Sequence, residues 1–113
     1  MEHTIDATNM KLGRAASKVA VLLIGKDASF QRNTTPKTVV KVVNASKIDI
    51  DERKRAGTIY HRHSGYRGSM VIEDMNKVIR DKGFAEVFRR TVYGMVPRSK
   101  LTKQMMKNLI ITE

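Results

Sequence analysis

The chain has 113 residues, a length that fits a single domain with one hydrophobic core, and 41% of its residues are hydrophobic. Lys and Arg number 22 against 11 Asp and Glu, a net charge of +11, and the absence of Cys excludes disulfides, thiolate zinc sites and cysteine nucleophiles. A domain this basic is typical of nucleic-acid binding; the alternative is a solvated surface with surplus lysine. No apolar run reaches the ~18 residues of a membrane span, so we expect a cytoplasmic protein with no membrane partner.

The first predicted elements are a short strand and a helix. The strand is expected over residues 4–7, and Thr8 and Asn9 are turn and cap residues. Apolar residues at helical spacing predict a helix over residues 12–24, and Gly25 ends it. The apolar stripe of this helix consists of Leu12, Ala16, Val19, Ala20 and Leu23. Three cations form a basic stripe on the other side: Lys11, Arg14 and Lys18.

The next predicted strand spans residues 38–44 and follows a polar loop over residues 26–37. It is β-branched and almost continuously apolar, which is the pattern of a central strand in a parallel sheet that is covered on both faces. The first strand, the helix and this strand together predict a right-handed crossover unit. A charged loop is predicted over residues 49–57, and it contains three consecutive cations: Arg53, Lys54 and Arg55.

The second half of the chain predicts one strand followed by helices. The strand spans residues 58–63 and leads to a glycine-hinged loop over residues 64–68. Helices are predicted over residues 72–82, where Gly83 ends the helix, and over residues 84–95, where apolar residues repeat at helical spacing. A last helix is marked by Leu101, Met105 and Leu109, and an edge strand follows over residues 110–112. Core filling is predicted for methionines such as Met75, Met95 and Met105.

The highest density of cations lies in residues 89–107. This segment has six basic residues and no acidic one: Arg89, Arg90, Arg98, Lys100, Lys103 and Lys107. Gly94, Met95 and Pro97 lie between two helices, where glycine permits a tight bend and proline prevents the first helix from continuing. We interpret these three residues as a structural corner that holds the cations in fixed positions for phosphate contact. The alternative is a solvated helix face.

Polar and aromatic residues surround the glycines of the 64–68 loop, and they are candidate RNA contacts: Arg62, His63, Tyr66 and Arg67. Glycine permits the close approach of an RNA backbone, and Tyr66 either stacks on an unpaired base or packs locally. The basic stripe of the first helix and the three cations at residues 53–55 are further candidate contacts. His61 and His63 alternate onto one face of the strand, but zinc needs at least three protein ligands and no neighbour supplies a third. No metal site is therefore predicted.

Four separated stretches occur in the order, and at roughly the spacing, of one protein family. They are Asp6-Ala7-Thr8 with Leu12-Gly13-Arg14-Ala15-Ala16, Val42-Val43-Asn44-Ala45 with Lys47-Ile48, Tyr60-His61-Arg62-His63-Ser64-Gly65-Tyr66, and Arg90-Thr91-Val92-Tyr93-Gly94-Met95-Val96-Pro97. In these stretches the chain resembles the bacterial-type large-subunit ribosomal protein L13 family, over about residues 4–112. Its N- and C-terminal ends are shorter than is usual in that family. Three positions also depart from the family pattern: Pro36-Lys37 replaces Gly-Asp, Tyr93 replaces a cation and Thr102 replaces a glycine.

The resemblance implies an α/β fold, with three α/β/α layers around a mainly parallel four-stranded sheet, in a single domain over residues 1–113. It also implies binding to large-subunit ribosomal RNA, contact with neighbouring large-subunit proteins, and a role in early subunit assembly. The expected location is the ribosome in the cytoplasm, and neither a cofactor nor catalysis is expected. Binding to mRNA is not predicted.

Two other functions compete with this interpretation. The first is a nucleic-acid-binding regulator that acts off the ribosome, but the sequence has no helix-turn-helix spacing and no repeated basic helix. The second is an enzyme that uses His61, His63 or a carboxylate. No compelling acid–base pair, glycine-rich phosphate loop or nucleophile elbow occurs in the sequence, so this hypothesis has little support.

Overall fold

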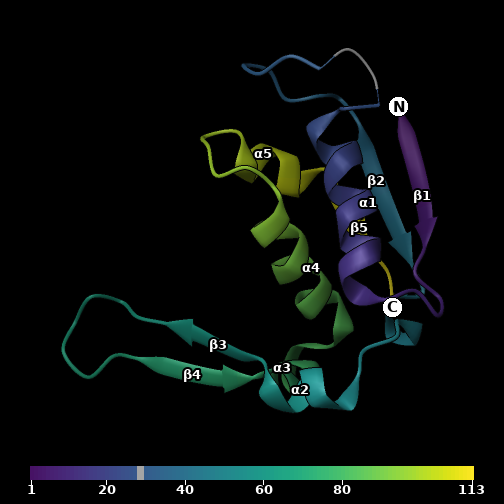
Figure 1. The fold of residues 1–113 in the computed structure, drawn as a ribbon. Coiled ribbons are helices and arrows are strands. Elements are labelled where there is room, and N and C mark those ends of the chain that lie inside the picture. The colour runs from purple at the N-terminus through teal and green to yellow at the C-terminus, as the bar shows by residue number, and fades with distance from the viewer. Residues whose placement is uncertain (28–29) are drawn as a thin grey trace.

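The computed structural model describes residues 1–27 and 30–113, and residues 28 and 29 of the predicted 26–37 loop lie outside the described residues. A parallel sheet, helices that pack against it and a separate hairpin make up the fold (Figure 1). In chain order the elements are β1 (Glu2–Asp6), α1 (Leu12–Ile24), β2 (Val39–Val43), a 3-10 turn η1 (Ala45–Lys47), α2 (Glu52–Gly57), β3 (Ile59–Arg62), β4 (Val71–Asp74), α3 (Met75–Lys82), α4 (Phe84–Met95), α5 (Thr102–Lys107) and β5 (Leu109–Ile111). No helix in the described ranges is long and apolar enough to cross a membrane.

β2 is the central strand of a parallel sheet with the order β1-β2-β5, as its apolar sequence predicts. Val40 and Val42 are fully buried in the core that includes the apolar stripe of α1. Lys41 points to the opposite face of the sheet and is exposed, so the prediction that both faces of β2 are covered is wrong. The described residues thus form a mixed α/β fold whose parallel sheet has three strands, one fewer than the resemblance implies.

α1 begins and ends at the residues that its periodicity predicts, and its whole predicted apolar stripe is buried. Gly25 adopts φ 84°, in the left-handed region, and its N–H donates to carbonyl groups of the last turn, so this glycine closes the helix. The residue before the helix is Lys11, which makes no side-chain cap. The cap predicted at Thr8 or Asn9 is therefore wrong, although Asn9 does lie in the turn that precedes α1 with φ 55°.

A hydrogen-bonded cluster around Asp6 joins the carboxyl ends of β1 and β2. The Asp6 carboxylate accepts hydrogen bonds from the Thr8 hydroxyl at 2.6 Å, the Thr8 N–H at 3.0 Å and the Asn44 amide at 3.1 Å. These bonds, those from Thr8 foremost, lower the pKa of Asp6 to about 2. Ala7 is fully buried beside them, and Asn44 adopts φ 59°. The first two of the four stretches that carry the family resemblance thus meet at this point.

Residues 52–57 form the helix α2, where the sequence predicts a charged loop. Glu52 lies in the first turn of α2, and Lys54 and Arg55 lie in its last turn, which is the charge order that the helix dipole favours. The guanidinium of Arg55 also lies over the Phe84 ring, 5.6 Å from the ring centroid. This contact ties α2 to the start of α4.

β3 and β4 pair in antiparallel register and form a hairpin that is separate from the parallel sheet. Figure 1 shows this hairpin extending away from the sheet, next to α2 and α3. The prediction of a strand at residues 58–63 is therefore confirmed. β4 occupies residues 71–74, where the sequence predicts the start of a helix, because these residues pair with β3. The predicted helix is thus shortened at its start and becomes α3.

α4 packs against both α1 and α3, and all three helices contribute to the hydrophobic core (Figure 1). Its buried residues are Val87, Phe88 and Val92. Its bounds are those predicted, and Gly83, with φ 85°, separates it from α3 as expected. Met75 and Met105 are buried as predicted, whereas Met95 is 40% exposed and does not fill the core. The last predicted helix and the edge strand are present as α5 and β5.

Candidate nucleic-acid interface

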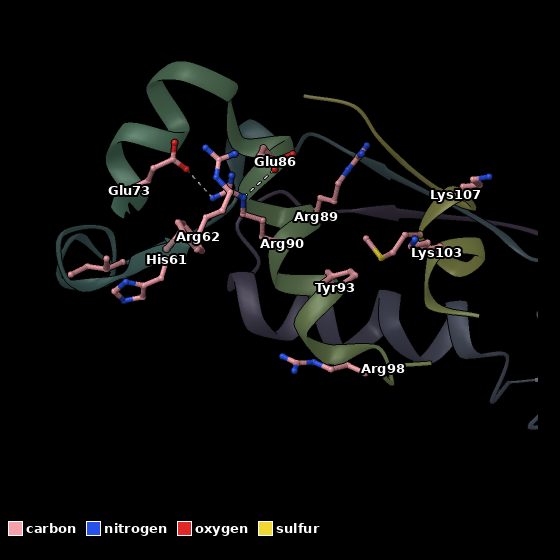
Figure 2. Close-up of a pocket in the computed structure, with 13 residues that line it drawn as sticks. His61, Arg62, Glu73, Glu86, Arg89, Arg90, Tyr93, Arg98, Lys103 and Lys107 are labelled. Atoms are coloured by element: carbon pink, nitrogen blue, oxygen red, sulfur yellow. Dashed lines mark hydrogen bonds and ion pairs between the residues drawn. The ribbon is translucent and has the colours of Figure 1, made fainter. Parts of the chain in front are cut away.

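A groove of about 940 Å³ is lined by residues of the β3–β4 hairpin, α4, α5 and the corner between these two helices (Figure 2). Its apolar residues, here called the floor, are Ile59, Tyr60, Tyr93 and Met106. Its polar and charged lining consists of His61, Arg62, Glu73, Glu86, Arg89, Arg90, Arg98, Lys103 and Lys107. The groove therefore combines an apolar floor with a predominantly cationic rim.

α4 contributes to the core with one face and to the groove with another. Its buried apolar residues occupy the first face. Glu86, Arg89, Arg90 and Tyr93 recur at three- and four-residue spacing, so they share a second face, and all four line the groove. The two lysines of α5 that line the groove are likewise four residues apart. Rigid helices, rather than flexible loops, therefore carry most of the groove's charge.

Arg90 forms ion pairs with both carboxylates of the groove. Its Nε donates to Glu86 at 3.0 Å, and its guanidinium lies 3.5 Å from the carboxylate of Glu73 on β4. It also lies over the Tyr60 ring of β3, 4.8 Å from the centroid, and burial raises the pKa of the Tyr60 hydroxyl. These contacts connect α4 to both strands of the hairpin, so Arg90 positions the hairpin as well as carrying charge.

The other five cations of the groove have no acidic partner in the part of the chain that the structure describes. They are Arg62, Arg89, Arg98, Lys103 and Lys107. The groove has six Arg and Lys side chains against two carboxylates, so it carries an excess of positive charge. Such a surface attracts phosphate groups.

Thr102 holds the corner between α4 and α5. Its hydroxyl donates to the Pro97 carbonyl at 2.5 Å and accepts from the Ser99 N–H at 2.9 Å, and the residue is buried. Pro97 follows the extended residue that ends α4, in agreement with its predicted role. Gly94 lies inside α4 and is not among the residues with positive φ, which differs from the predicted bend. The bend therefore depends on a threonine that the sequence analysis treats only as a departure.

The basic stripe of α1 does not line the groove. Lys11 Nζ lies 2.6 Å from Asp49 and 3.1 Å from Asp51, and the hydrogen bonds to these carboxylates, Asp49 first, raise the pKa of Lys11. Arg14 and Lys18 are exposed and form no salt bridge with the residues that the structure describes.

The tip of the hairpin carries the predicted glycine hinge. Gly65 and Gly68 adopt φ 92° and 75°, which only glycine tolerates readily, and His63 Nδ1 accepts a hydrogen bond from the Gly65 N–H at 2.9 Å. Tyr66 is 80% exposed, so local packing does not explain it, and Arg67 is exposed as well. The described residues contain no group of three or more His, Asp or Glu side chains that could hold a metal ion.

The remaining predicted contacts lie on other surfaces. Arg53 and Lys54 are exposed on α2, whereas Arg55 is half-buried. Lys100 is exposed in the corner but does not line the groove. The predicted cations therefore divide into a cluster at the groove and smaller groups on α1, α2 and the hairpin tip.

The floor and the acidic residues of the groove were not predicted from the sequence. Glu86 and Arg90 are four residues apart on a predicted helix, a spacing that favours an ion pair, so this contact could be found from sequence. The contacts of Tyr60 and Glu73 with Arg90 could not be found from sequence, because nothing in the sequence indicates that β3 pairs with β4 and lies beside α4. The structural role of Thr102 could not be predicted from the sequence, because its two hydrogen-bond partners depend on how the corner folds.

The α/β fold and its cationic groove are typical of a nucleic-acid-binding protein. The sequence matches the family described as Ribosomal protein L13 over residues 1–112. It is 38% identical over 110 residues to the large ribosomal subunit protein uL13 of Pelobacter propionicus, and the aligned residues make up 96% of this chain and 77% of that protein. It is 35% identical over 106 residues to the large ribosomal subunit protein uL13c of Guillardia theta, and the aligned residues make up 93% of this chain and 73% of that protein. The chain therefore belongs to the ribosomal protein L13 family, and the resemblance seen in the four stretches is confirmed.

Proposed function

We propose that the protein is a structural constituent of the large ribosomal subunit that binds large-subunit ribosomal RNA and supports early subunit assembly. The observation that carries this proposal is the groove, whose five cations have no acidic partner among the described residues. Relatives that are named large ribosomal subunit proteins support it. The protein would act in the ribosome, in contact with RNA and neighbouring large-subunit proteins, and it is not an enzyme.

The fixed positions of the cations suit the recognition of folded RNA. α4 packs in the core, Thr102 fixes the corner, and Arg90 ties the hairpin to α4. The protein therefore sets the spacing of its charges before RNA binds. Phosphate contacts carry no base-sequence information directly, so binding of this kind recognises the shape of a folded RNA.

The proposed RNA-binding set extends beyond the free cations of the groove. It also contains Lys11, Arg14, Lys18, Arg53, Lys54, Arg55, His63, Tyr66, Arg67, Arg90 and Lys100. Within this set, Lys11 and Arg90 should contribute least to phosphate binding, because carboxylates already compensate their charges. The groups on α1, α2 and the hairpin tip would contact RNA segments other than the one in the groove.

The proposal retains the three-layer α/β/α arrangement around a four-stranded sheet that the resemblance implies. Two observations leave room for it: within the described residues, β1 and β5 each pair on one side only, and the sheet face that bears Lys41 is open to a further layer. A structure of the protein bound to its RNA tests this part of the proposal: a sheet that keeps three strands and an open face would overturn it.

The test of the proposed function compares two triple variants that remove the same charge. One replaces Arg89, Arg98 and Lys103 of the groove with Gln, and the control replaces Arg32, Arg80 and Lys77, which are exposed elsewhere. Binding to large-subunit ribosomal RNA is measured at low ionic strength, and gradient sedimentation shows whether each variant travels with large-subunit particles. We expect the groove variant to lose binding and co-sedimentation and the control to keep both. Equal behaviour of the two variants, or wild-type protein that stays off the particles, would overturn the proposal.

A further inference from the structure

We infer that the groove holds unpaired nucleotides of the RNA, with one base stacked on the ring of Tyr93 and the adjacent phosphates on the surrounding cations. This inference rests on the proposed function and adds the form of RNA that the groove accepts. It differs from phosphate contact alone, which any stretch of duplex could provide. Three observations carry it: the size of the groove, the exposure of its two tyrosine rings, and the position of the cations around them.

The size of the groove suits a nucleotide rather than a duplex. Its volume of about 940 Å³ lies within the range of roughly 300–1,000 Å³ that is common for small-ligand sites. In an RNA duplex the bases are stacked inside, and the deep major groove does not admit side chains. A duplex could therefore touch the cationic rim, but it would leave the apolar floor in contact with water. An unstacked base can cover that floor.

Of the two tyrosine rings in the groove, Tyr93 is the one that is free to stack. Tyr60 is half-buried, and the guanidinium of Arg90 covers its ring at 4.8 Å. Tyr93 is 50% exposed, and no cation is stacked on it among the described residues. An exposed aromatic ring on the wall of a basic groove is the arrangement with which proteins bind unpaired bases.

The cations around Tyr93 are placed for the phosphates of such a strand. Arg89 lies four residues before Tyr93 on the same face of α4, and Arg98 and Lys103 line the groove from the corner and from α5. Figure 2 shows Tyr93 among these three side chains. All three lack acidic partners in the described part of the chain, so the charge of the groove favours RNA over an uncharged peptide. An acidic protein segment is the competing occupant, and the experiment includes it.

The experiment measures binding of the full chain to two synthetic RNA hairpins at low ionic strength. One hairpin is fully paired, and the other carries a short bulge that contains 2-aminopurine, whose fluorescence falls when it stacks. The proteins are the wild type, Tyr93→Phe, Tyr93→Leu and the control Phe30→Leu. Phe30 is a 53% exposed ring outside the groove. Circular dichroism establishes that each variant is folded, and a glutamate-rich peptide serves as the competitor.

We expect the wild type, Tyr93→Phe and Phe30→Leu to prefer the bulged hairpin and to quench its fluorescence. Tyr93→Leu should bind that hairpin about five- to one-hundredfold more weakly and lose the quenching, because stacking on an aromatic ring stabilises a bound base by this factor. Equal affinity of the wild type for both hairpins, or an unchanged Tyr93→Leu, would overturn the inference and leave the proposed function intact. Displacement of the bulged RNA by the peptide at equimolar concentration would also overturn it. No binding of any RNA would overturn both.

Discussion

Single residues at two positions fix the local geometry on which this fold depends. Asp6 accepts three hydrogen bonds and so joins the turn after β1 to the end of β2. Thr102 satisfies two backbone groups of the corner between α4 and α5. Both residues act through hydrogen bonds rather than through apolar packing, so substitutions that remove only the hydrogen-bonding groups measure their contributions.

The Asp6 cluster predicts a specific dependence of stability on pH. The folded state lowers the pKa of Asp6 from the ordinary 3.8 to about 2, so its stabilising effect is complete above pH 4 and is lost as the pH falls through about 2. We expect Asp6→Asn to lower the melting temperature at neutral pH, and the difference from wild type to shrink between about pH 4 and pH 2. Thermal unfolding across this range is the measurement, with the exposed-site variant Asp81→Asn as the control. A difference that is constant with pH would refute the assignment.

The corner predicts that Thr102→Val is destabilising although it preserves shape. The variant removes a buried hydroxyl and leaves the Ser99 N–H and the Pro97 carbonyl without this partner, which should cost about 1–3 kcal/mol of unfolding free energy. Thr102→Ser keeps the hydroxyl and should lose less. Urea unfolding of the three proteins checks both values. If the valine variant were as stable as wild type, the hydroxyl would have no structural role.

At Gly94, in contrast to Thr102, we expect a substitution that stabilises the protein. It lies inside α4, and a Cβ atom built on it meets no atom within 4 Å. Gly94→Ala should therefore raise the unfolding free energy by about 0.5–1 kcal/mol, because alanine loses less backbone entropy in a helix. Urea unfolding measures the gain. A loss of stability would show that this position needs glycine within the protein itself.

At the scale of elements, the helices and strands that could be predicted from the sequence are those whose pattern of apolar residues matches their buried face. The bounds of α1 and α4 follow from their apolar stripes, and β2 follows from its β-branched run. The misassigned elements are β4, which depends on a distant partner, and α2, a short charged helix with no buried residue and therefore no apolar period. Residues 71–74 have only two β-branched residues, Val71 and Ile72, which is too short a strand signal on its own, and they form β4 by pairing with β3. The cations of the groove were predicted from sequence, but its floor was not, because the hairpin brings Ile59 and Tyr60 beside α4 only in three dimensions.

The attachment of the hairpin to α4 can be tested through Arg90. Arg90→Gln removes its ion pairs with Glu73 and Glu86 and should lower the unfolding free energy by about 1 kcal/mol, with faster amide hydrogen exchange in β3 and β4. Arg89→Gln is the matched control, because it removes the same charge from the neighbouring position without breaking an ion pair in the described chain. Its stability should stay within about 0.5 kcal/mol of wild type. Equal effects of the two changes would mean that the ion pairs do not hold the hairpin.

At the scale of the whole molecule, the net charge of +11 is distributed along the entire chain, and five of the cations that lack acidic partners among the described residues gather in the groove. Lys11 and Arg90 are compensated locally, as are Lys41 by Glu2 and Arg80 by Asp81. Sequence composition therefore predicts a polyanion as partner, whereas only the structure separates the compensated cations from the free ones.

This distribution predicts the salt dependence of RNA binding. If the five free cations of the groove each contact one phosphate, they should contribute a slope of roughly −3.5 to −4.5 to the plot of log affinity against log salt concentration. The triple groove variant should reduce the magnitude of that slope by about 2–3, whereas the triple control variant leaves it unchanged. Filter binding over a range of salt concentrations measures the slopes. A slope near zero for wild type would exclude phosphate contact as the basis of binding.

The hairpin is joined to the core without a linker. β4 ends at Asp74, and α3 starts at Met75, whose side chain is buried and whose N–H donates to the carbonyl of Thr58 just before β3. The opening between the hairpin and the helices is thus coupled to interior packing, and widening it would disturb the contacts of α3 with α4. When the two molecules associate, the conformational adjustment should therefore fall on the RNA, and the protein serves as the rigid template around which that RNA takes its shape.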